Sequence, residues 1–512
     1  MSSLPREVRT VAIVVIVGAI MSILDTTIVN VALETLARDL HSPLSTIQWV
    51  STGYLLSLAT VIPLTGWAAE RFGPKHVWMT VVGLFVATSG LCGLAWSAES
   101  LIAFRVLQGL AGGMIMPIGM ITLAQTAGPR RMGAVMSVVG VPMLLGPVLG
   151  PVIGGFIVTH LSWRWIFYVN LPIGLVGLAL AARLLPAGRA EGRGGIAAGE
   201  VGLDWVGLLL LSPGVALIVF GLSEISTAGG ISFVRILPVL VGLVMVALFV
   251  RHAWRCENPI VDIRLLRGRG FAAAAGTVFL VGAALFGALL LLPLYYQVAR
   301  GESAFHAGLL MAPQGVGAAL GMNRAGRLTD RVGGGRVVIA GLAMLMVGTI
   351  AFTQVGPGTS FWLLDGSLVL RGLGLGFTMM PAMAAAYATL ENAGEVPRAT
   401  PMLNVIQRVG GSLGTAVLAV ILEHQISTQL AAAGLHGNGG DIGSVRAVPA
   451  AVRHRLAQPL ATAFGHAYWW ALAGTAIALV PAIVLAFAER ASRRESAAAA
   501  QRASRTPSPI PG

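Results

Sequence analysis

The chain has 512 residues, of which 56% are hydrophobic and only 11% are charged. Soluble domains carry about 25% charged residues, so this composition excludes an ordinary soluble protein and indicates a membrane protein with many spanning helices. The net charge of +13 does not point to nucleic acid, because the arginines cluster in alternate loops and no basic stretch is interleaved with aromatic residues. Two cysteines, Cys92 and Cys256, leave no room for a disulfide framework or a cysteine metal site.

Fourteen apolar stretches are long enough to cross a hydrocarbon core about 30 Å thick. In chain order they cover 10–33, 47–69, 77–96, 101–124, 133–158, 163–185, 203–223, 233–253, 271–297, 306–325, 336–353, 361–385, 401–422 and 466–488. Arginine-rich loops alternate with loops that contain no Lys or Arg, such as 97–100, 224–232 and 354–360. Positive charge marks the cytoplasmic side, so both termini are predicted to lie in the cytoplasm.

One short motif occurs twice. Residues 66–73 read GWAAERFG, and 260 residues later 326–333 read GRLTDRVG. The copies follow the second and the tenth apolar stretch, and Arg105 in the fourth stretch is echoed by Arg371 in the twelfth. Both offsets are eight stretches, which predicts two duplicated six-helix bundles with two extra helices between them, arranged 6+2+6. Such a duplication is typical of a two-halved transporter rather than of a channel, a receptor or a membrane enzyme.

This count divides the chain into four parts. We expect an N-terminal six-helix bundle over 1–190, two additional linker helices over 191–260 and a C-terminal six-helix bundle over 261–490. The C-terminal bundle is expected to include an extracytoplasmic loop at 423–465, and residues 491–512 are expected to form a disordered cytoplasmic tail.

Four motifs stand in one order along the chain: LDTTIVNVAL at 24–33, GWAAERFGPK at 66–75, FRVLQGLAGG at 104–113 and GPVLGPVIGG at 146–155. Together they resemble the 14-helix drug:proton antiporter family of the major facilitator superfamily, over nearly the whole chain. The resemblance implies an all-α polytopic membrane protein with the major facilitator fold. It also implies export of lipophilic drugs or toxic compounds across the bacterial cytoplasmic (inner) membrane in exchange for protons. Glu34 and Ser137 depart from the family pattern, which usually has proline and glycine at these places.

Asp25 lies well inside the first apolar stretch, where an ionised carboxylate is costly and usually serves an ion pathway. Burial disfavours the charged form of a carboxyl group while a nearby cation favours it, so the two effects together can bring proton exchange near neutral pH. Arg105 is the expected partner, and the pair is predicted to couple proton movement to transport. The alternative is structural, with Asp25 as a polar anchor and Arg105 as a tie to loops near helix ends.

The fifth stretch carries a small-residue motif. Gly146, Gly150 and Gly154 recur every four residues, Pro147 and Pro151 do likewise, and Gly155 ends the motif. The glycines offer one smooth face for close helix contact and the prolines bend the helix. The resemblance implies that this antiporter motif seals the transport path against leak, whereas generic helix packing is the alternative.

The repeated loop motif places an acid beside an arginine, as Glu70-Arg71 in the first copy and Asp330-Arg331 in the second. Glycines frame each pair, Gly66 and Gly73 in the first copy. The arginines can bond to carbonyls at helix C-termini and the acids can sit at helix N-termini. We expect the two motifs to latch the cytoplasmic side in the outward-open state. Charge that merely sets topology would not explain the paired acid.

Substrates of two-halved transporters bind near the bilayer midplane between the halves. The candidate lining residues are Asn30, Tyr54, Gln108, Met116, Gln297, Gln314, Asn404 and Gln407. No metal cluster, Walker loop or nucleophile elbow is recognisable, so we expect neither an enzyme nor a metal or cofactor, and the proton gradient is the expected drive. A dedicated exporter of one native metabolite, lipid or antibiotic remains an alternative, and the need for a periplasmic adaptor is left open.

Overall fold

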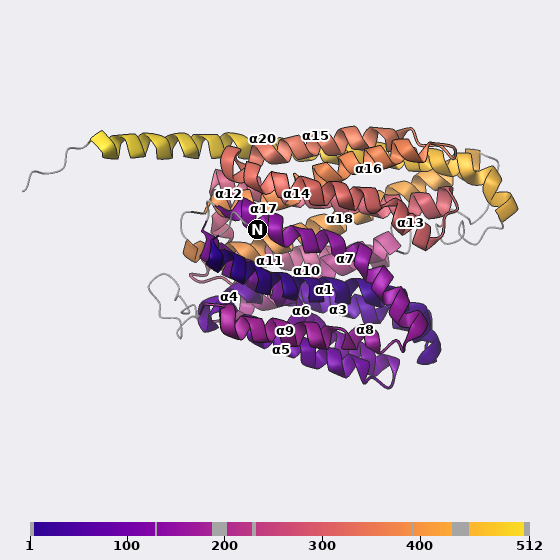
Figure 1. Cartoon of the computed structure of the whole chain (residues 1–512), viewed down its shortest axis with the longest axis horizontal. Coiled ribbons are helices and arrows are strands. Elements are labelled where there is room, and N and C mark those ends of the chain that lie inside the picture. Colours follow the sequence, from indigo (N-terminus) through magenta and orange to yellow (C-terminus); the bar gives the residue numbers. More distant parts are fainter. Residues whose placement is uncertain are drawn as a thin grey trace, which may run out of the picture.

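The computed structural model describes residues 5–128, 131–186, 202–227, 232–390, 393–432 and 450–505. Across these ranges the regular structure is helical, with no strand. The long helices run side by side, and those of the N-terminal part form one group beneath those of the C-terminal part (Figure 1).

The N-terminal group contains nine helical segments. They are α1 (Arg6–Asp39), α2 (Leu44–Ile47), α3 (Trp49–Val61), α4 (Leu64–Phe72), α5 (Pro74–Gly93), α6 (Ala98–Ala127), α7 (Met132–His160), α8 (Trp165–Tyr168) and α9 (Asn170–Leu184). Two further helices follow, α10 (Trp205–Thr227) and α11 (Phe233–Arg255), and these two pack against each other.

The C-terminal group begins with the short η3 (Ile263–Arg267). It continues as α12 (Arg269–Leu294), the π-helical η4 (Tyr295–Ala299), α13 (Ala304–Leu310), α14 (Ala312–Val332), α15 (Gly334–Thr353), α16 (Phe361–Gly376), α17 (Met379–Ala388), η5 (Ala393–Glu395), α18 (Val396–Ala432) and α20 (Ala450–Arg505). The most extensive packing within this group pairs α12 with α18, α14 with α16, and α20 with both α12 and α15.

Helices occupy each of the fourteen predicted stretches. Among the described residues, eleven helices are long and apolar enough to cross a membrane, and a twelfth crossing arises if the bent pair 44–61 and 64–72 counts as one. That pair turns by 56° at Pro63, where proline removes a backbone donor and breaks the helix. The number fourteen and the 6+2+6 grouping stay predictions.

Two expected irregular segments are partly helical. Residues 423–432 continue α18, and α20 begins at Ala450 and runs through Arg505, so that helix occupies both ends of the expected loop 423–465 and most of the expected tail 491–512. Both ends of the expected loop pack into the C-terminal group, through Ile426 and Leu430 on one side and Leu456 and Leu460 on the other. The composition of these segments, rich in Ala, Leu, Gln, Glu and Arg, also favours helix. The end of α20 projects from the body of the molecule (Figure 1).

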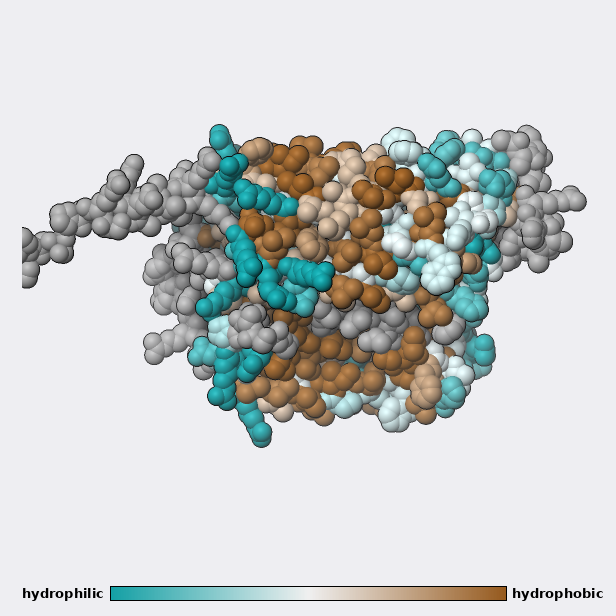
Figure 2. Space-filling model, turned by 45° about the horizontal axis from the view of Figure 1, so that its top comes forward, coloured by the Kyte–Doolittle hydropathy of each residue, from teal (hydrophilic) through white to brown (hydrophobic). Residues whose placement is uncertain are grey.

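A broad apolar band crosses one face of the molecule. Figure 2 shows hydrophobic residues across the middle of the visible face and hydrophilic residues gathered at the two ends. We call the end that contains Arg71 and Arg331 the basic end. A slab of apolar surface between two polar caps is the arrangement that a bilayer stabilises.

Tight turns at the basic end depend on the last glycine of each repeated motif. Gly73 connects α4 to α5 with a φ of 80°, and Gly333 connects α14 to α15 with a φ of 100°. Other residues rarely adopt this left-handed region, which explains why both motif copies end in glycine.

The two groups meet where glycines remove side chains from the seam. The α7 helix packs on α14, and α4 packs on α18. A Cβ added at Gly326 would meet the carbonyl oxygen of Gly133, and one at Gly66 would meet the carbonyl oxygen of Pro397. The first glycine of each motif copy therefore allows backbones of opposite groups to touch, as small residues do at membrane helix interfaces.

Part of the antiporter motif packs α7 on α1. A Cβ on Gly150 would meet the side chain of Thr27, and one on Gly154 would lie 3.2 Å from the Ile28 carbonyl oxygen. Gly155 faces open space instead. The surroundings of Gly146, Pro147 and Pro151 lie outside the described residues.

This contact generates a test of stability with a matched control. Alanine normally favours a helix over glycine by about 1 kcal/mol. At Gly150 the added methyl group would collide with Thr27, so we expect Gly150→Ala to lower the free energy of unfolding by about 1–3 kcal/mol. Gly155→Ala should be neutral or stabilising. The measurement is the thermal midpoint of each purified variant in detergent, and equal midpoints would contradict the packing described.

Candidate functional site

The buried carboxylate of Asp25 on α1 is held by three side chains. Arg105 Nη1 on α6 donates to Oδ2 at 2.6 Å, Gln108 Nε2 donates to Oδ1 at 3.1 Å, and Asn170 Nδ2 on α9 donates to the same oxygen at 2.8 Å. Asp25 has 0% of its surface exposed and Arg105 has 1%. The structure therefore brings together the two residues expected to interact, as a fully buried ion pair.

Arg105 is fixed from the other side by backbone and aromatic groups. Its Nε donates to the carbonyl oxygen of Val50 at 3.2 Å, and its guanidinium carbon lies 3.9 Å from the ring centre of Tyr54 and 5.7 Å from that of Phe167. Ring faces stabilise a desolvated cation electrostatically. The charge of the pair is thus compensated within a small volume shared by α1, α3, α6 and the α8–α9 segment.

Sequence reasoning missed Asn170 and the hydrogen bonds that hold its side chain in place. Asn170 also donates to Ser89 Oγ at 3.0 Å, and Ser89 in turn donates to the carbonyl oxygen of Phe167 at 2.9 Å. An asparagine inside the sixth apolar stretch was the available signal, because a polar side chain in a membrane helix usually bonds to another helix.

A central cavity of about 440 Å³ lies between the two groups of helices. Its wall combines residues from α1, α6, α7, α10, α12, α17 and α18, so it draws on both groups and on α10 between them in the sequence. The volume lies within the range of small-molecule sites. Five methionines line it: Met116, Met120, Met136, Met380 and Met383. Flexible, polarisable methionines adapt to ligands of different shape.

Of the eight residues expected to line a substrate site, three line this cavity, namely Met116, Asn404 and Gln407. The structure places the other five elsewhere. Tyr54 and Gln108 belong to the Asp25 network, Asn30 is exposed and accepts from Ser51 Oγ at 3.0 Å, Gln297 lies in η4, and Gln314 lines a separate small cavity in the C-terminal group.

Arg408 is a lining residue that sequence reasoning missed. It lies on α18, next to Gln407, and is the one ionisable side chain in the described wall of the cavity. Within the described residues Arg408 makes no hydrogen bond and no ion pair. Its signal in the sequence is plain, since an arginine interrupts the apolar stretch 401–422.

At the basic end, Asp330 of the second motif copy bonds across the seam. Its carboxylate oxygens accept from the backbone N–H groups of Gly133 at 2.8 Å and Ala134 at 3.0 Å, in the first turn of α7. A carboxylate at this place satisfies two donors that the helix leaves unpaired and complements the helix dipole.

Glu70 of the first copy crosses the seam differently. Its Oε1 accepts from Arg398 Nε at 3.1 Å, in the first turn of α18, and Arg398 Nη1 lies 3.9 Å from Asp262 Oδ2. Pro397 of α18 corresponds to Gly133 of α7, because its carbonyl oxygen faces Gly66 as that of Gly133 faces Gly326. Proline has no backbone N–H that could donate to the acid. The arginine side chain supplies the donor instead. Arg71 lies over the rings of Trp67 and Phe72.

One group of metal-type ligands occurs in the described part of the chain, although no metal site was expected. Ligand atoms of Asp204, His252 and Cys256 lie within 4.8 Å of one another. The Asp204 carboxylate is already engaged, because it accepts from the N–H groups of Gly207 and Ile260 and bonds to His252 Nε2 at 2.8 Å. We assign this cluster a structural role that ties α10 to the end of α11.

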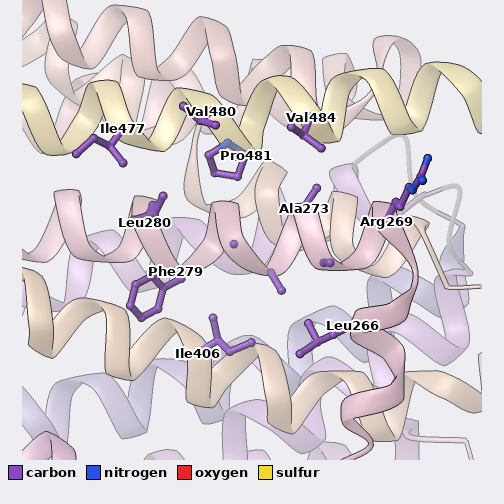
Figure 3. Close-up of a pocket in the computed structure, with 13 residues that line it drawn as sticks. Leu266, Arg269, Ala273, Phe279, Leu280, Ile406, Ile477, Val480, Pro481 and Val484 are labelled. Carbon is purple, nitrogen blue, oxygen red and sulfur yellow. The ribbon is translucent and has the colours of Figure 1, made fainter.

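A groove between α12, α18 and α20 is nearly all apolar (Figure 3). In that view Val480 and Pro481 of α20 lie above the α12 ribbon, Phe279 and Ile406 lie below it, and Arg269 lies at one end. All of its lining residues belong to the C-terminal group, whereas the central cavity draws on both groups. The central cavity is therefore the better candidate for a transport site.

Comparison with known proteins agrees with this architecture. A family model described as the Major Facilitator Superfamily matches residues 15–415. The chain is 42% identical over 418 residues to a Mycobacterium tuberculosis protein named multidrug resistance protein B homolog, covering 81% of this chain and 76% of that protein. It is 31% identical over 446 residues to the putative multidrug resistance protein MdtD of Cronobacter sakazakii, covering 84% and 90%.

Two solved structures share the fold. The proton:xylose symporter XylE, bound to a deoxyglucose derivative, has a TM-score of 0.59 at 13% identity, covering 92% of this chain and 94% of the symporter. The human organic anion transporter MFSD10 has a TM-score of 0.58 at 16% identity, covering 92% and 100%. Since the family model spans most of the chain and a relative is 42% identical over 81% of it, the chain belongs to the major facilitator superfamily and is a multi-pass membrane transporter rather than an enzyme.

Proposed function

We propose that the protein is a proton-coupled antiporter that exports lipophilic drugs or toxic compounds across the bacterial cytoplasmic membrane by alternating access. The names of its relatives support drug efflux. The observation that carries the proton coupling is the fully buried Asp25–Arg105 pair in the N-terminal group. We further propose fourteen crossings arranged 6+2+6, with α10 and α11 as the added pair and both termini in the cytoplasm.

The pair has the chemistry that proton exchange requires. An ionised Asp25 satisfies Arg105, Gln108 and Asn170 at once, because a carboxylate only accepts hydrogen bonds. Protonation would remove the charge that balances Arg105, and the buried cation would then favour a rearrangement of α1 against α6. Binding and release of a proton thereby become linked to helix movement, which is the coupling an antiporter needs.

The test compares variants in proteoliposomes with an imposed pH gradient. Asp25→Asn should reduce gradient-driven export of a labelled lipophilic substrate to the level of empty liposomes. Because that change leaves Arg105 uncompensated, the double variant Asp25→Asn with Arg105→Gln provides a version without buried charge. Glu34→Gln, an exposed acid on the same helix, is the control. Undiminished export that still depends on the pH gradient in either Asp25 variant would refute the proposed role.

The contacts across the seam support a state closed at the basic end, which we assign to the cytoplasmic side. Asp330 and Glu70 each join one group of helices to the other at that end. The described geometry is then an outward-facing one, with the two motif copies acting as latches.

Loss of one latch should shift the balance of states. Asp330→Ala removes the acceptor for two α7 amides, which costs about 1–3 kcal/mol and should raise the population open at the basic end about tenfold. Distances between spin labels on the adjoining ends of α7 and α14 report this opening. Asp39→Ala, at the exposed far end of α1, is the control. Unchanged label distances in Asp330→Ala would contradict the latch.

The central cavity suggests the chemistry of the cargo. Its methionine wall suits apolar ligands of varied shape, and Arg408 adds one positive charge without a carboxylate in the described wall. We therefore expect Arg408→Gln to reduce export of lipophilic anions about tenfold more than export of neutral compounds, with Arg408→Lys retaining much of the preference. Export rates across a matched substrate panel measure this. Equal losses for anionic and neutral substrates would contradict the assignment.

The alternative, a dedicated exporter of one native metabolite, lipid or antibiotic, is consistent with the same cavity. A narrow substrate profile in that panel would favour it over multidrug export.

A further inference from the structure

Arg371 on α16 is a buried cation without a counterion in the described structure. It has 3% of its surface exposed, and neither its Nε nor its Nη1 has a hydrogen-bond partner. Its guanidinium carbon lies 5.1 Å from the ring centre of Phe352 and 5.6 Å from that of Tyr468. Rings stabilise a cation only partly, and an arginine inside a membrane helix normally pairs with an acid or with carbonyl groups.

The internal repeat shows what stands opposite this arginine. On α6, added Cβ atoms at Gly109 and Gly113 would meet the carbonyl oxygens of Tyr54 and Leu58. On α16, a Cβ added at Gly372 would meet the carbonyl oxygen of Gln314, and one added at Gly376 would meet the carbonyl oxygen of Ala318. The glycines correspond at an offset of 263 residues, so Arg371 takes the place of Gln108. The sequence motif aligns Arg371 with Arg105 instead, and that alignment differs from the structural one by three residues, about one helical turn.

The residue of the C-terminal group that corresponds to Asp25 can be found in the same way. Gly150 of α7 faces Thr27 of α1, and Gly414 of α18 faces Ala283 of α12. Thr27 and Ala283 therefore correspond, and so do the residues two places before them. Val281 on α12 thus holds the place that Asp25 holds on α1. In the N-terminal group a carboxylate accepts from Gln108 and Arg105, whereas in the C-terminal group a valine faces Arg371.

A small cavity lies between these residues. Its lining includes Val281, Gln314, Thr349, Arg371 and Thr475, and its volume of about 20 Å³ is enough for one water molecule or one monatomic ion. The two threonine hydroxyls already donate to backbone carbonyls. The donors that can serve an occupant are therefore the guanidinium of Arg371 and the amide of Gln314.

We propose that a small inorganic anion, of the size and charge of chloride, binds in this cavity and takes the place that the Asp25 carboxylate holds in the other half. The lining carries a positive charge and the described wall of the cavity contains no carboxylate. An anion there would supply Arg371 with both a counter-charge and hydrogen-bond acceptors, and would stabilise the packing of α12, α14, α16 and α20. The cavity is too small for a drug molecule, so the site is separate from the proposed transport site.

The experiment measures thermal stability of the purified full-length protein in detergent, in sodium chloride or bromide against sodium gluconate at equal ionic strength. We expect the wild-type midpoint to rise by about 2–4 °C with halide, saturably. Val281→Asp should abolish this dependence while remaining stable in gluconate, because it restores an internal carboxylate. Arg371→Met should also abolish it, and Arg371→Lys should keep part of it.

Bromide soaked into crystals of the wild-type protein should give an anomalous peak beside Arg371, and this peak should disappear in Val281→Asp. A midpoint independent of halide, an equal halide effect in wild type and Val281→Asp, or water without anomalous signal in the cavity would each overturn the proposal. None of these readouts depends on transport, so the result stands apart from the proposed antiport.

Discussion

A charge buried in a low-dielectric interior must find a partner, and this requirement organises the N-terminal half. Arg105 cannot lose its proton, so Asp25 must stay ionised or the helices around the pair must move. Gln108, Asn170 and the Tyr54 ring then hold the pair in one geometry. These side chains come from α1, α3, α6 and α9, so the buried pair ties four helices of the N-terminal group together.

A second constraint acts at the seam between the halves, where backbones touch and, in the proposed alternating-access cycle, must also separate. Gly66 and Gly326 permit the contact, and Glu70 and Asp330 add polar bonds at the same places. Apolar packing alone would leave no group at the seam that could bond to water once the two groups of helices separate. Bonds between a carboxylate and a helix end are directional and can exchange with water when the seam opens, which suits a reversible closure.

Much of the architecture could be read from the chain because membrane helices are long, apolar and flanked by charge. The Asp25–Arg105 contact could be anticipated too, since each residue alone would be intolerable in a hydrocarbon core. Asn170, Arg398 and Arg408 were missed, because a polar side chain in the sequence does not reveal which neighbour it meets. The echo of Arg105 by Arg371 could not reveal a shift of about one helical turn between the repeats, whereas the glycine contacts between backbones do.

The two halves descend from one pattern yet treat charge in opposite ways. The N-terminal half carries its acid in the chain, at Asp25, and compensates it with Arg105. The C-terminal half carries a cation at Arg371 in the same small cavity as Val281, and Arg408 of the same half faces the central cavity. A symmetric molecule with an acid in each half would leave no buried arginine without an internal counterion. In the proposed mechanism, proton exchange therefore falls to the N-terminal group at Asp25, whereas Arg408 of the C-terminal group gives the central cavity its positive charge. The driving ion and the cargo would then be bound by different halves of the molecule.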